Sequence, residues 1–336
     1  MSQFSDKDVI LSVMEYNFHD RISENNLNIA FGIDKNFLFG CGVSIASILL
    51  SNKSINFDFH VFTDHFSEDD QKRFSALAEQ YKTCIKVYLI DCNKLKSLPS
   101  TKNWTYATYF RFVIADYFYG KLEKLLYLDA DIACKGSIQE LVDYSFTEHE
   151  IAAVVAERDI EWWTDRSVTL TTPELVSGYF NAGFLLININ EWQKNDISVK
   201  AIEMLRVPEW VAKITHLDQD VLNILLVGKV NFIDGKYNTR FSINYELKDK
   251  VVNPVNNDTV FIHYVGPTKP WHEWANYPVS QSFIYAKEHS PWCNVALLQP
   301  ANSNQYRYCA KHKFKQKRFL QGVLNYIKYY KAKTIK

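Results

Sequence analysis

The sequence predicts an α/β protein built around a mostly parallel, doubly wound sheet, and three observations lead to this fold class. Short apolar segments typical of buried strands alternate along the chain with segments whose apolar residues recur at helical spacing. Two of the apolar segments end in acidic residues, as expected where the carboxyl edge of a parallel sheet forms a binding site. The 336 residues, 47% of them hydrophobic, supply the core that one large domain of this kind needs.

The expected elements follow one another from residue 28 to residue 265. A first strand at 28–34 ends in Asp34, and a helical segment at 40–50 comes next. Ser67 and Asp70 have the S-x-x-D spacing of a capping box, which predicts that a helix begins there. Further strands are expected at 57–63, 84–90, 125–132, 151–156, 181–188 and 260–265, and further helices at 105–117 and from Asp218 onward. The polar segment 1–27 is expected to hold one short helix at most.

Composition divides the chain into three parts: an N-terminal extension over 1–27, one catalytic domain over 28–280 and a helical C-terminal region over 281–336. Residues 311–336 carry nine Lys and Arg and no acidic residue, which leaves residues 1–310 with 29 basic and 38 acidic side chains, a net charge of −9. Apolar residues recur at helical spacing in this basic segment, which is typical of a helix that lies on a membrane surface. They are Leu320, Val323, Leu324, Ile327 and Tyr330. A plain solvated terminus and a nucleic-acid-binding tail are the competing interpretations, and nothing else in the sequence supports a nucleic-acid partner.

The cysteines and the apolar segments indicate the cellular compartment. Six cysteines show neither a C-x-x-C pair nor regular spacing, so we expect free, mostly buried thiols in a reducing environment. The first residues lack the basic start and unbroken apolar stretch of a signal peptide, and no segment is long and apolar enough to span a bilayer. The sequence therefore predicts a cytoplasmic protein.

Asp129 and Asp131 are the most informative candidate site residues. They end the apolar segment 124–132 one residue apart, so on a strand their side chains would share one face. Two carboxylates at the end of a buried strand need a positive partner, and a divalent cation that also binds a diphosphate would supply it. A bare D-x-D also fits a strand that runs into an acidic loop. Because Asp34 ends another strand at the same edge, the convergence of charge favours a binding site.

A second candidate cluster occupies 263–271. His263 ends a strand, where its imidazole could complete the metal site, and two oxygen ligands with one nitrogen suit Mn²⁺ better than Mg²⁺. Gly266 allows backbone to approach a ligand closely, and Lys269 could reach a phosphate as a point charge. Taken singly, His263 also fits a hydrogen-bonded core histidine and Lys269 a solvated surface charge.

These motifs together resemble the retaining family 8 glycosyltransferases, which use a nucleotide-sugar donor. The matching pieces stand in order over residues 28 to about 275: GIDKNF at 32–37, TYFRF at 108–112, YLDAD at 127–131, GYFNAGFLLIN at 178–188, LDQDVLN at 217–223 and HYVGPTKPW at 263–271. Among these enzymes, the chain is most similar to the lipopolysaccharide core hexosyltransferases of bacteria. The resemblance implies a GT-A glycosyltransferase fold, with a Rossmann-like, mostly parallel sheet that binds a UDP-sugar.

The resemblance also implies a reaction and a place in the cell. We expect transfer of galactose from UDP-galactose in α-1,3 linkage onto a glucose of the lipopolysaccharide outer core, with Mn²⁺ as cofactor and Mg²⁺ as the alternative metal. A UDP-glucose-dependent α-glucosyltransferase of the same core pathway is the alternative. The acceptor is anchored in the inner membrane, so the basic tail is expected to hold the protein peripherally on its cytoplasmic face.

Roles for single residues follow only from the resemblance. Asp129, Asp131 and His263 would hold the metal against the diphosphate. The remaining donor contacts would come from Gly32, Asp34, Asn36 and Phe37 at the uridine, Ala130, Gly266 and Lys269 at the diphosphate, and Arg111, Asn181, Asp218 and Gln219 around the sugar. Glu157 falls where relatives often carry an acid near the acceptor or donor sugar. Because an amide oxygen is a weak nucleophile, retention is expected to proceed by same-face attack of the acceptor, with a double displacement as the alternative.

Two other classes of protein compete with this interpretation. A metal-dependent phosphohydrolase also uses paired aspartates, but a haloacid-dehalogenase-type enzyme needs Gly-Thr or Gly-Val downstream, and Ala133 and Cys134 follow here instead. An inactive sugar-nucleotide-binding protein is the other alternative, and the intact set of Asp129, Asp131, His263 and Lys269 argues against it.

Overall fold

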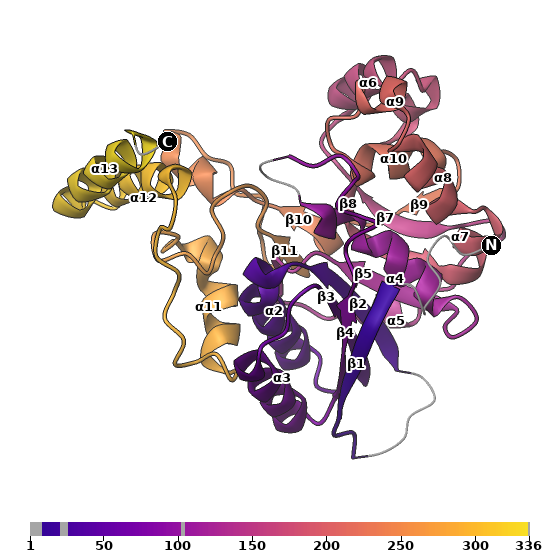
Figure 1. Ribbon diagram of the computed structural model, residues 1–336, viewed down its shortest axis with the longest axis horizontal. Coiled ribbons are helices and arrows are strands. Elements are labelled where there is room, and N and C mark those ends of the chain that lie inside the picture. The colour runs from indigo at the N-terminus through magenta and orange to yellow at the C-terminus, as the bar shows by residue number, and fades with distance from the viewer. Residues whose placement is uncertain (1–8, 21–25, 102–104, 335–336) are drawn as a thin grey trace.

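An eight-stranded sheet forms the centre of the computed structural model, which describes residues 9–20, 26–101 and 105–334 (Figure 1). Its strand order is β1-β4-β3-β2-β5-β8-β7-β9. The strands span β1 Ile10–Asn17, β2 Leu27–Ile33, β3 Phe57–Thr63, β4 Cys84–Ile90, β5 Lys124–Leu128, β7 Ala152–Ala156, β8 Phe180–Asn188 and β9 Val230–Phe232. The run from β4 through β5 is parallel, whereas β1 and β8 join their neighbours antiparallel. The predicted mostly parallel α/β sheet is therefore confirmed.

A smaller three-stranded sheet stands at the carboxyl edge of the large one. It consists of β6 Ile132–Cys134, β10 Thr239–Arg240 and β11 Phe261–His263, in the order β10-β11-β6. Three residues separate the end of β5 from the start of β6, so the chain passes from one sheet to the other between Leu128 and Ile132. This crossing places the D-x-D motif at the junction of the two sheets.

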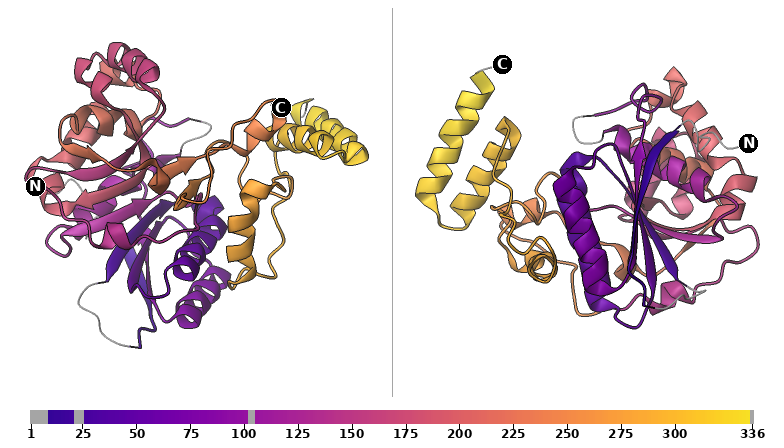
Figure 2. Two further views of the ribbon diagram at one scale, coloured as in Figure 1. Left: turned by 180° about the vertical axis from the view of Figure 1, so that it is seen from behind. Right: turned by 60° about the horizontal axis from the view of Figure 1, so that its bottom comes forward.

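Helices cover both faces of the large sheet (Figures 1 and 2). Helices α2 Leu38–Ser51, α3 Glu68–Tyr81 and α11 Gln281–Glu288 lie on one face. Helices α4 Phe110–Phe118, α7 Ile189–Lys194, α8 Ile197–Met204 and α10 Asp218–Leu225 lie on the other. Shorter helices connect these layers: α5 Gln139–Val142, α6 Ile160–Thr169, α9 Pro208–Val211, and the 3-10 turns η1 Lys35–Phe37, η2 Tyr106–Tyr109, η3 Pro173–Ser177, η4 Gly235–Asn238, η5 Ile243–Leu247 and η6 Pro278–Ser280.

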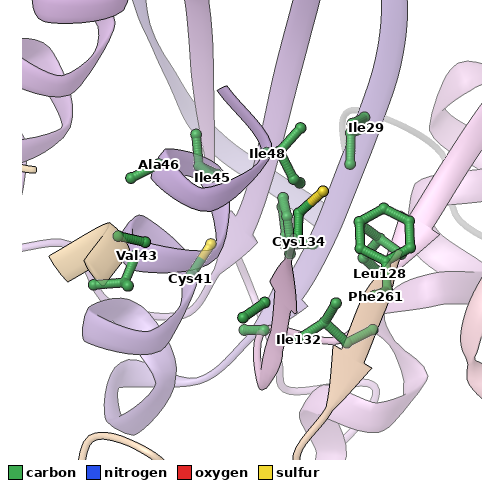
Figure 3. Packing of buried hydrophobic residues seen from close by; sticks show 14 of the residues in the cluster. Ile29, Cys41, Val43, Ile45, Ala46, Ile48, Leu128, Ile132, Cys134 and Phe261 are labelled. Carbon is green, nitrogen blue, oxygen red and sulfur yellow. The ribbon is translucent and has the colours of Figure 1, made fainter. Parts of the chain in front are cut away.

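The apolar sequence of α2 explains why this helix is the centre of one core. Nearly every residue from Leu38 to Leu49 is buried, as expected for a helix that is hydrophobic all round. Figure 3 shows Cys41, Ile45 and Ile48 of α2 beside side chains of β2, β5 and β6. The packed helix therefore holds the junction between the two sheets in place.

Most predicted elements agree with the structure, and the capping box at Ser67 is present with both of its hydrogen bonds. The predicted strand over 125–132 is wrong at its end. The amide of Asp129 donates to the carbonyl of Gly183 (2.9 Å), and the amide of Tyr264 donates to the carbonyl of Asp131 (2.9 Å), so the two residues pair with different partners. Asp129 and Asp131 consequently lie in a turn and not on one strand face.

The expectation for residues 1–27 is also wrong, because Ile10–Asn17 forms strand β1 at the edge of the sheet, antiparallel to β4. An edge strand has one open side, and no residue of β1 is fully buried. The apolar pattern that reveals a central strand is therefore weak here. The predicted helix over 105–117 is confirmed as two pieces, the turn η2 followed by α4.

The chain ends in a hairpin of two helices, α12 Ser303–Lys315 and α13 Phe319–Thr334, which projects from the body of the protein (Figure 2). The predicted basic tail begins inside α12, whose His312 and Lys313 are buried, and only α13 has the exposed apolar residues. Among the described residues, no helix has the length and apolar character required to cross a membrane. All six cysteines lie in the described part of the chain and are free, as predicted.

Candidate active site

Asp129, Asp131 and His263 come together at the junction of the two sheets. The turn after β5 carries the aspartates and the end of β11 carries the histidine, and one ligand atom from each residue lies within 4.8 Å of the others. The Nε2 atom of His263 is 3.1 Å from Oδ1 of Asp131 and 3.9 Å from Oδ2 of Asp129. The predicted metal-binding residues are therefore neighbours in space.

A chain of amides fixes which nitrogen of His263 faces the aspartates. The backbone amide of Gly183 donates to Oδ1 of Asn181 (3.1 Å), which identifies that atom as an acceptor. Asn238 must then donate its Nδ2 to the same oxygen (3.0 Å) and accept at its own Oδ1 from Nδ1 of His263 (2.9 Å). In the tautomer that this hydrogen bond selects, the lone pair of Nε2 faces Asp129 and Asp131, which is the arrangement of a metal-ligating histidine.

Two further observations show that this cluster fits a divalent cation. Oδ1 of Asp131 is buried and accepts no hydrogen bond, although a buried carboxylate oxygen normally has a partner. Gly183 leaves space beside the cluster, because a Cβ atom there would lie 2.5 Å from Cε1 of His263 and 2.7 Å from Oδ2 of Asp129. Two carboxylates and one imidazole form a mixed oxygen and nitrogen donor set, which suits Mn²⁺.

Lys269 provides a positive charge next to the cluster. Its ammonium group forms an ion pair with Oδ2 of Asp131 and donates to the carbonyl of Tyr264 (2.9 Å). Burial acts to raise the pKa of Asp131, but the ammonium group of Lys269 acts in the opposite direction, and the net effect holds that pKa well below its usual value. Gly266, in the same loop, has φ +88° and leaves room for Oγ of Ser242, which would lie 2.9 Å from an added Cβ. A side chain at position 266 would therefore displace the loop.

Arg111 and Asp218 form a buried ion pair on the opposite side of the cluster. Nε of Arg111 is 3.0 Å from Oδ2 of Asp218, and its Nη2 is 3.3 Å from Oδ1 of Asp129. Arg111 is 3% exposed, so its guanidinium group is buried at the base of the site. Burial raises the pKa of Asp218 to about 6, although Arg111 and the hydroxyl of Thr108 act in the opposite direction.

Gln219 is the centre of a polar network at the start of α10. Its Oε1 accepts from the backbone amide of Ala182 (3.1 Å) and from Nδ2 of Asn181 (3.0 Å). Its Nε2 donates to Oε2 of Glu157 (3.2 Å), which also accepts from Asn181 (2.9 Å). The other oxygen of Glu157 forms an ion pair with Arg240. Asn181 is thus a residue of strand β8 that orients its neighbours.

A single cleft of about 450 Å³ brings these groups together. The predicted site residues that line it are Arg111, Asp129, Asp131, Asn181, Asp218, Gln219, His263, Gly266 and Lys269. None of the residues proposed for the uridine is part of the cleft lining, but Phe37 lies close to Lys269, which is. Asp34 caps the turn η1 by accepting from the amide of Asn36 (2.9 Å), and the ring of Phe37 is 6.0 Å from Nζ of Lys269.

Two predicted donor contacts have a packing role in the structure. Gly32 lies against α4, because a Cβ atom there would be 2.6 Å from Cβ of Phe110. Ala130 lies in the turn between Asp129 and Asp131, and its side chain belongs to the hydrophobic core around α2. Neither residue is part of the cleft lining.

The cleft also includes polar residues that the sequence did not single out, namely Thr108, Arg158, His216, Arg240 and Tyr245. Asn238 was missed as well, although it orients His263. These residues belong to loops and short turns without a periodic pattern, and a lone Asn or Arg in such a segment carries no signal of its own. Only their neighbours in the fold reveal them.

Comparison with known families agrees with this geometry. Residues 28–275 match the family described as "Glycosyl transferase family 8", and residues 277–333 match "Glycosyl transferase family 8 C-terminal". The chain is 64% identical to the lipopolysaccharide 1,3-galactosyltransferase of Salmonella typhimurium, over 99% of both chains. It is 56% identical to the lipopolysaccharide glucosyltransferase WaaO of Escherichia coli, over 97% of both chains.

Solved structures resemble this fold at lower sequence identity. The galactosyltransferase LgtC, in a complex with donor and acceptor sugar analogues, superposes with a TM-score of 0.67 at 23% identity, over 79% of this chain and 96% of that one. The bifunctional glycosyltransferase WbbM superposes with a TM-score of 0.65 at 19% identity, over 81% of this chain and 51% of that one. Both have the GT-A fold, so the predicted fold class is confirmed.

Proposed function

Because the chain belongs to glycosyl transferase family 8 and is a hexosyltransferase, we propose that it transfers galactose from UDP-galactose, with retention, onto a glucose of the lipopolysaccharide outer core. The linkage formed is α-1,3. Sequence identity of 64% with a lipopolysaccharide 1,3-galactosyltransferase supports this choice of donor and linkage. In the structure, one observation carries the proposal: the candidate metal cluster and the polar residues around Gln219 line one cleft, as a nucleotide sugar requires.

Asp129, Asp131 and His263 are the residues that would hold Mn²⁺. When bound there, the cation would neutralise charge on the departing diphosphate. Lys269 stands beside Asp131 and adds a second positive charge at the same side of the cleft. Together these groups favour departure of UDP from the anomeric carbon.

Arg111, Asp218, Asn181 and Gln219 line the same cleft and are the proposed partners of the donor sugar. Arg111 is held by Asp218 and by the carbonyl of Ala182, so its guanidinium is in place before any substrate binds. A fixed polar wall of this kind orients hydroxyl groups with little loss of entropy.

Same-face attack by the acceptor is the proposed route to retention. A double displacement needs a free carboxylate as nucleophile. Glu157 is the carboxylate nearest to Gln219, and it is already paired with Arg240 while accepting from Asn181 and Gln219. The oxygen atoms of this carboxylate are already engaged by these partners, which makes it a weak nucleophile.

A panel of UDP-sugars tests this proposal. Purified protein is incubated with Mn²⁺, a lipopolysaccharide core acceptor and UDP-galactose or UDP-glucose, and the product is examined by proton NMR. We expect transfer from UDP-galactose and the small anomeric coupling of an α-linked hexose. A large coupling, typical of a β-linked hexose, would exclude retention.

UDP-glucose is the second candidate donor, and the 56% identity with the glucosyltransferase WaaO supports it. The two donors differ only at the C4 hydroxyl, so the same panel decides between them. Preferential transfer from UDP-glucose would replace galactose in the proposal while leaving the family assignment unchanged.

The proposed acceptor lies on a membrane, and α13 is the proposed means of reaching it. Its exposed residues include Phe319, Leu320, Val323, Leu324 and Ile327, with basic residues on the same helix. Such a helix binds an anionic bilayer through apolar burial and through attraction of about 1 kcal/mol per basic residue. Docking at the cytoplasmic face of the inner membrane would bring the cleft to a membrane-anchored acceptor.

A further inference from the structure

The loop at residues 264–277 carries both Gly266 and Lys269 and has a well-defined internal structure. The amide of Lys269 donates to Nδ1 of His272 (3.1 Å), and the amide of His272 donates to the carbonyl of Lys269 (3.0 Å). The ring of His272 stacks on Trp274 with the centroids 4.2 Å apart. The position of Lys269 is therefore tied to the segment that follows it.

Helix α12 contacts this segment from the side away from the cleft. Nζ of Lys313 is 2.5 Å from Oε1 of Glu273, and Nε2 of Gln316 donates to the carbonyl of Trp274 (3.0 Å). These contacts hold the half of the loop that follows Lys269.

His312 holds the half of the loop that precedes Lys269. Its Nε2 donates to Oδ1 of Asn244 (2.9 Å), and the same oxygen accepts from the hydroxyl of Thr268 (2.7 Å). Its Nδ1 accepts from the hydroxyl of Tyr277 (2.7 Å), so both ring nitrogens are engaged. Thr268 directly precedes Lys269 in the chain, so α12 holds the loop on both sides of the lysine.

The burial of these side chains indicates that the contact is specific. Lys313 is 2% exposed and His312 is fully buried. A buried lysine is unfavourable compared with an apolar residue of similar size unless it fixes a particular arrangement. A helix that served only to cover the loop would present leucine or methionine at these positions.

The loop held by α12 also reaches the residues proposed for the uridine. Trp271 fills the space above Gly40, where a Cβ atom would lie 2.5 Å from the indole ring. The indole meets the ring of Phe37 edge to face, with centroids 5.6 Å apart. A shift of the loop would consequently move two residues together. They are Lys269, proposed to bind the diphosphate, and Trp271, which supports the ring of Phe37 proposed to stack on uracil.

We propose that His312 and Lys313 are positioning residues, through which α12 sets the affinity of the cleft for the nucleoside diphosphate part of the donor. This inference rests on the proposed function, because it concerns the same cleft. The C-terminal helices thereby belong to the donor site, in addition to any contact with a membrane. Lys313 acts through Glu273 and the loop on Lys269, and His312 acts through Asn244 and Thr268.

Binding of UDP to the full-length protein in saturating Mn²⁺, measured by calorimetry, tests the proposal. Lys313→Met is expected to weaken UDP binding about tenfold, the effect of losing roughly 1.4 kcal/mol. Lys311→Met is the matched control, since Lys311 is the exposed lysine two positions away on the same helix, and it should bind UDP like the wild type. Glu273→Gln breaks the same ion pair from the loop and should reproduce the loss, which keeps the test informative if Lys313→Met does not fold.

A second measurement separates positioning from a general loss of structure. If Lys313 acts through Lys269, then adding Lys313→Met to Lys269→Ala should cause no further loss of UDP affinity. Wild-type affinity in Lys313→Met and Glu273→Gln would overturn the inference, and so would losses that simply add to that of Lys269→Ala. A wild-type protein that does not bind UDP would instead overturn the proposed function on which the inference rests.

Discussion

Side-chain amides contribute as much to the geometry of this cleft as the charged groups do. Asn181, Asn238 and Gln219 are each oriented by a chain of hydrogen bonds that begins at a backbone amide of Ala182 or Gly183. Backbone donors have fixed positions, so the side-chain amides that they orient in turn fix the orientation of His263 and Glu157. The acids and the histidine of the site are thus oriented before a ligand binds.

Removing one carboxylate of the metal cluster should abolish catalysis without unfolding the protein. Asp131→Asn is expected to lower the rate of sugar transfer by several orders of magnitude, because the cation loses a ligand. Asp143→Asn, at an exposed position, is the control and should retain the wild-type rate. Transfer that persists in excess EDTA would contradict the assignment of a metal.

The amide of Asn238 is expected to influence the affinity for Mn²⁺ through His263. Asn238→Leu removes the acceptor that orients His263 and should weaken Mn²⁺ binding by about tenfold to a hundredfold. Asn238→Asp retains an acceptor for Nδ1 of His263 and should bind Mn²⁺ more tightly than Asn238→Leu does. Titration followed by the electron paramagnetic resonance of free Mn²⁺ measures both, and equal affinity in the two variants would show that Asn238 does not orient the histidine.

Individual elements show what the sequence could and could not predict. Central strands such as β3 and β4 are buried on both faces, so their apolar runs give their bounds directly. The end of β5 was missed because the apolar pattern continues through Ile132 while the hydrogen bonds move to the second sheet. Strand β1 was missed because an edge strand is only half covered.

Sequence pattern reveals some residues of the site and not others. Acidic residues at strand ends, such as Asp129 and Asp131, can be recognised from the sequence, because a charged residue is unexpected directly after a run of buried apolar residues. Asn238 and Arg240 lie in a short turn and a two-residue strand, where sequence pattern carries no information on what they face. Their roles depend on contacts with residues 57 and 83 positions earlier in the chain, which only the fold creates.

Membrane docking by α13 is predicted to depend on its apolar face. Leu320→Glu combined with Leu324→Glu should abolish co-sedimentation with anionic vesicles at low salt, because both residues are well exposed and would enter the bilayer. Hydrolysis of the UDP-sugar in solution should remain unchanged, since α13 lies outside the cleft lining. Gln321→Glu, at an exposed position with one added charge, is the milder control.

Vesicle binding that survives the double substitution would assign the membrane contact to another surface. Substitution is preferable to removal of residues 311–336, because that segment includes the buried His312 and Lys313 of α12. Such a deletion would also disturb the loop of Lys269, so an effect on membrane docking could not be separated from an effect on catalysis.

Across the whole molecule, three buried histidines connect stability to pH. Burial lowers the pKa of His60 to about 3, of His272 to about 3 and of His312 to about 4. They lie in the sheet, in the loop of Lys269 and in α12, so they report on separate parts of one structure.

The sign of the effect follows from proton counting. Between about pH 6.5 and pH 4 the unfolded chain protonates these histidines while the folded protein does not, so folding is favoured at higher pH. The free energy of unfolding should fall as the pH decreases below about 6.5, by up to about 1.4 kcal/mol per pH unit for each histidine. Chemical denaturation at several pH values measures this slope.

His60→Gln should reduce the slope, because it removes one of the three groups while keeping polar contacts with Tyr88 and Asn28. His149→Gln changes an exposed histidine and should leave the slope unchanged. Stability that is constant between pH 6.5 and pH 5 would contradict the assignment of these histidines as neutral in the folded protein.

The C-terminal hairpin has a geometric consequence. Three residues, Gln316 to Arg318, connect α12 to α13, and Gly322 fits so closely against Phe314 that an added Cβ would lie 2.8 Å from its ring. Helix α12 of this hairpin contacts the loop at residues 264–277, which carries Lys269, and α13 is the proposed membrane contact. With α13 docked on a bilayer as proposed, the distance from the membrane surface to the cleft would be fixed. We would then expect transfer only to an acceptor whose terminal sugar lies at that distance, and not to a glycan one residue shorter or longer.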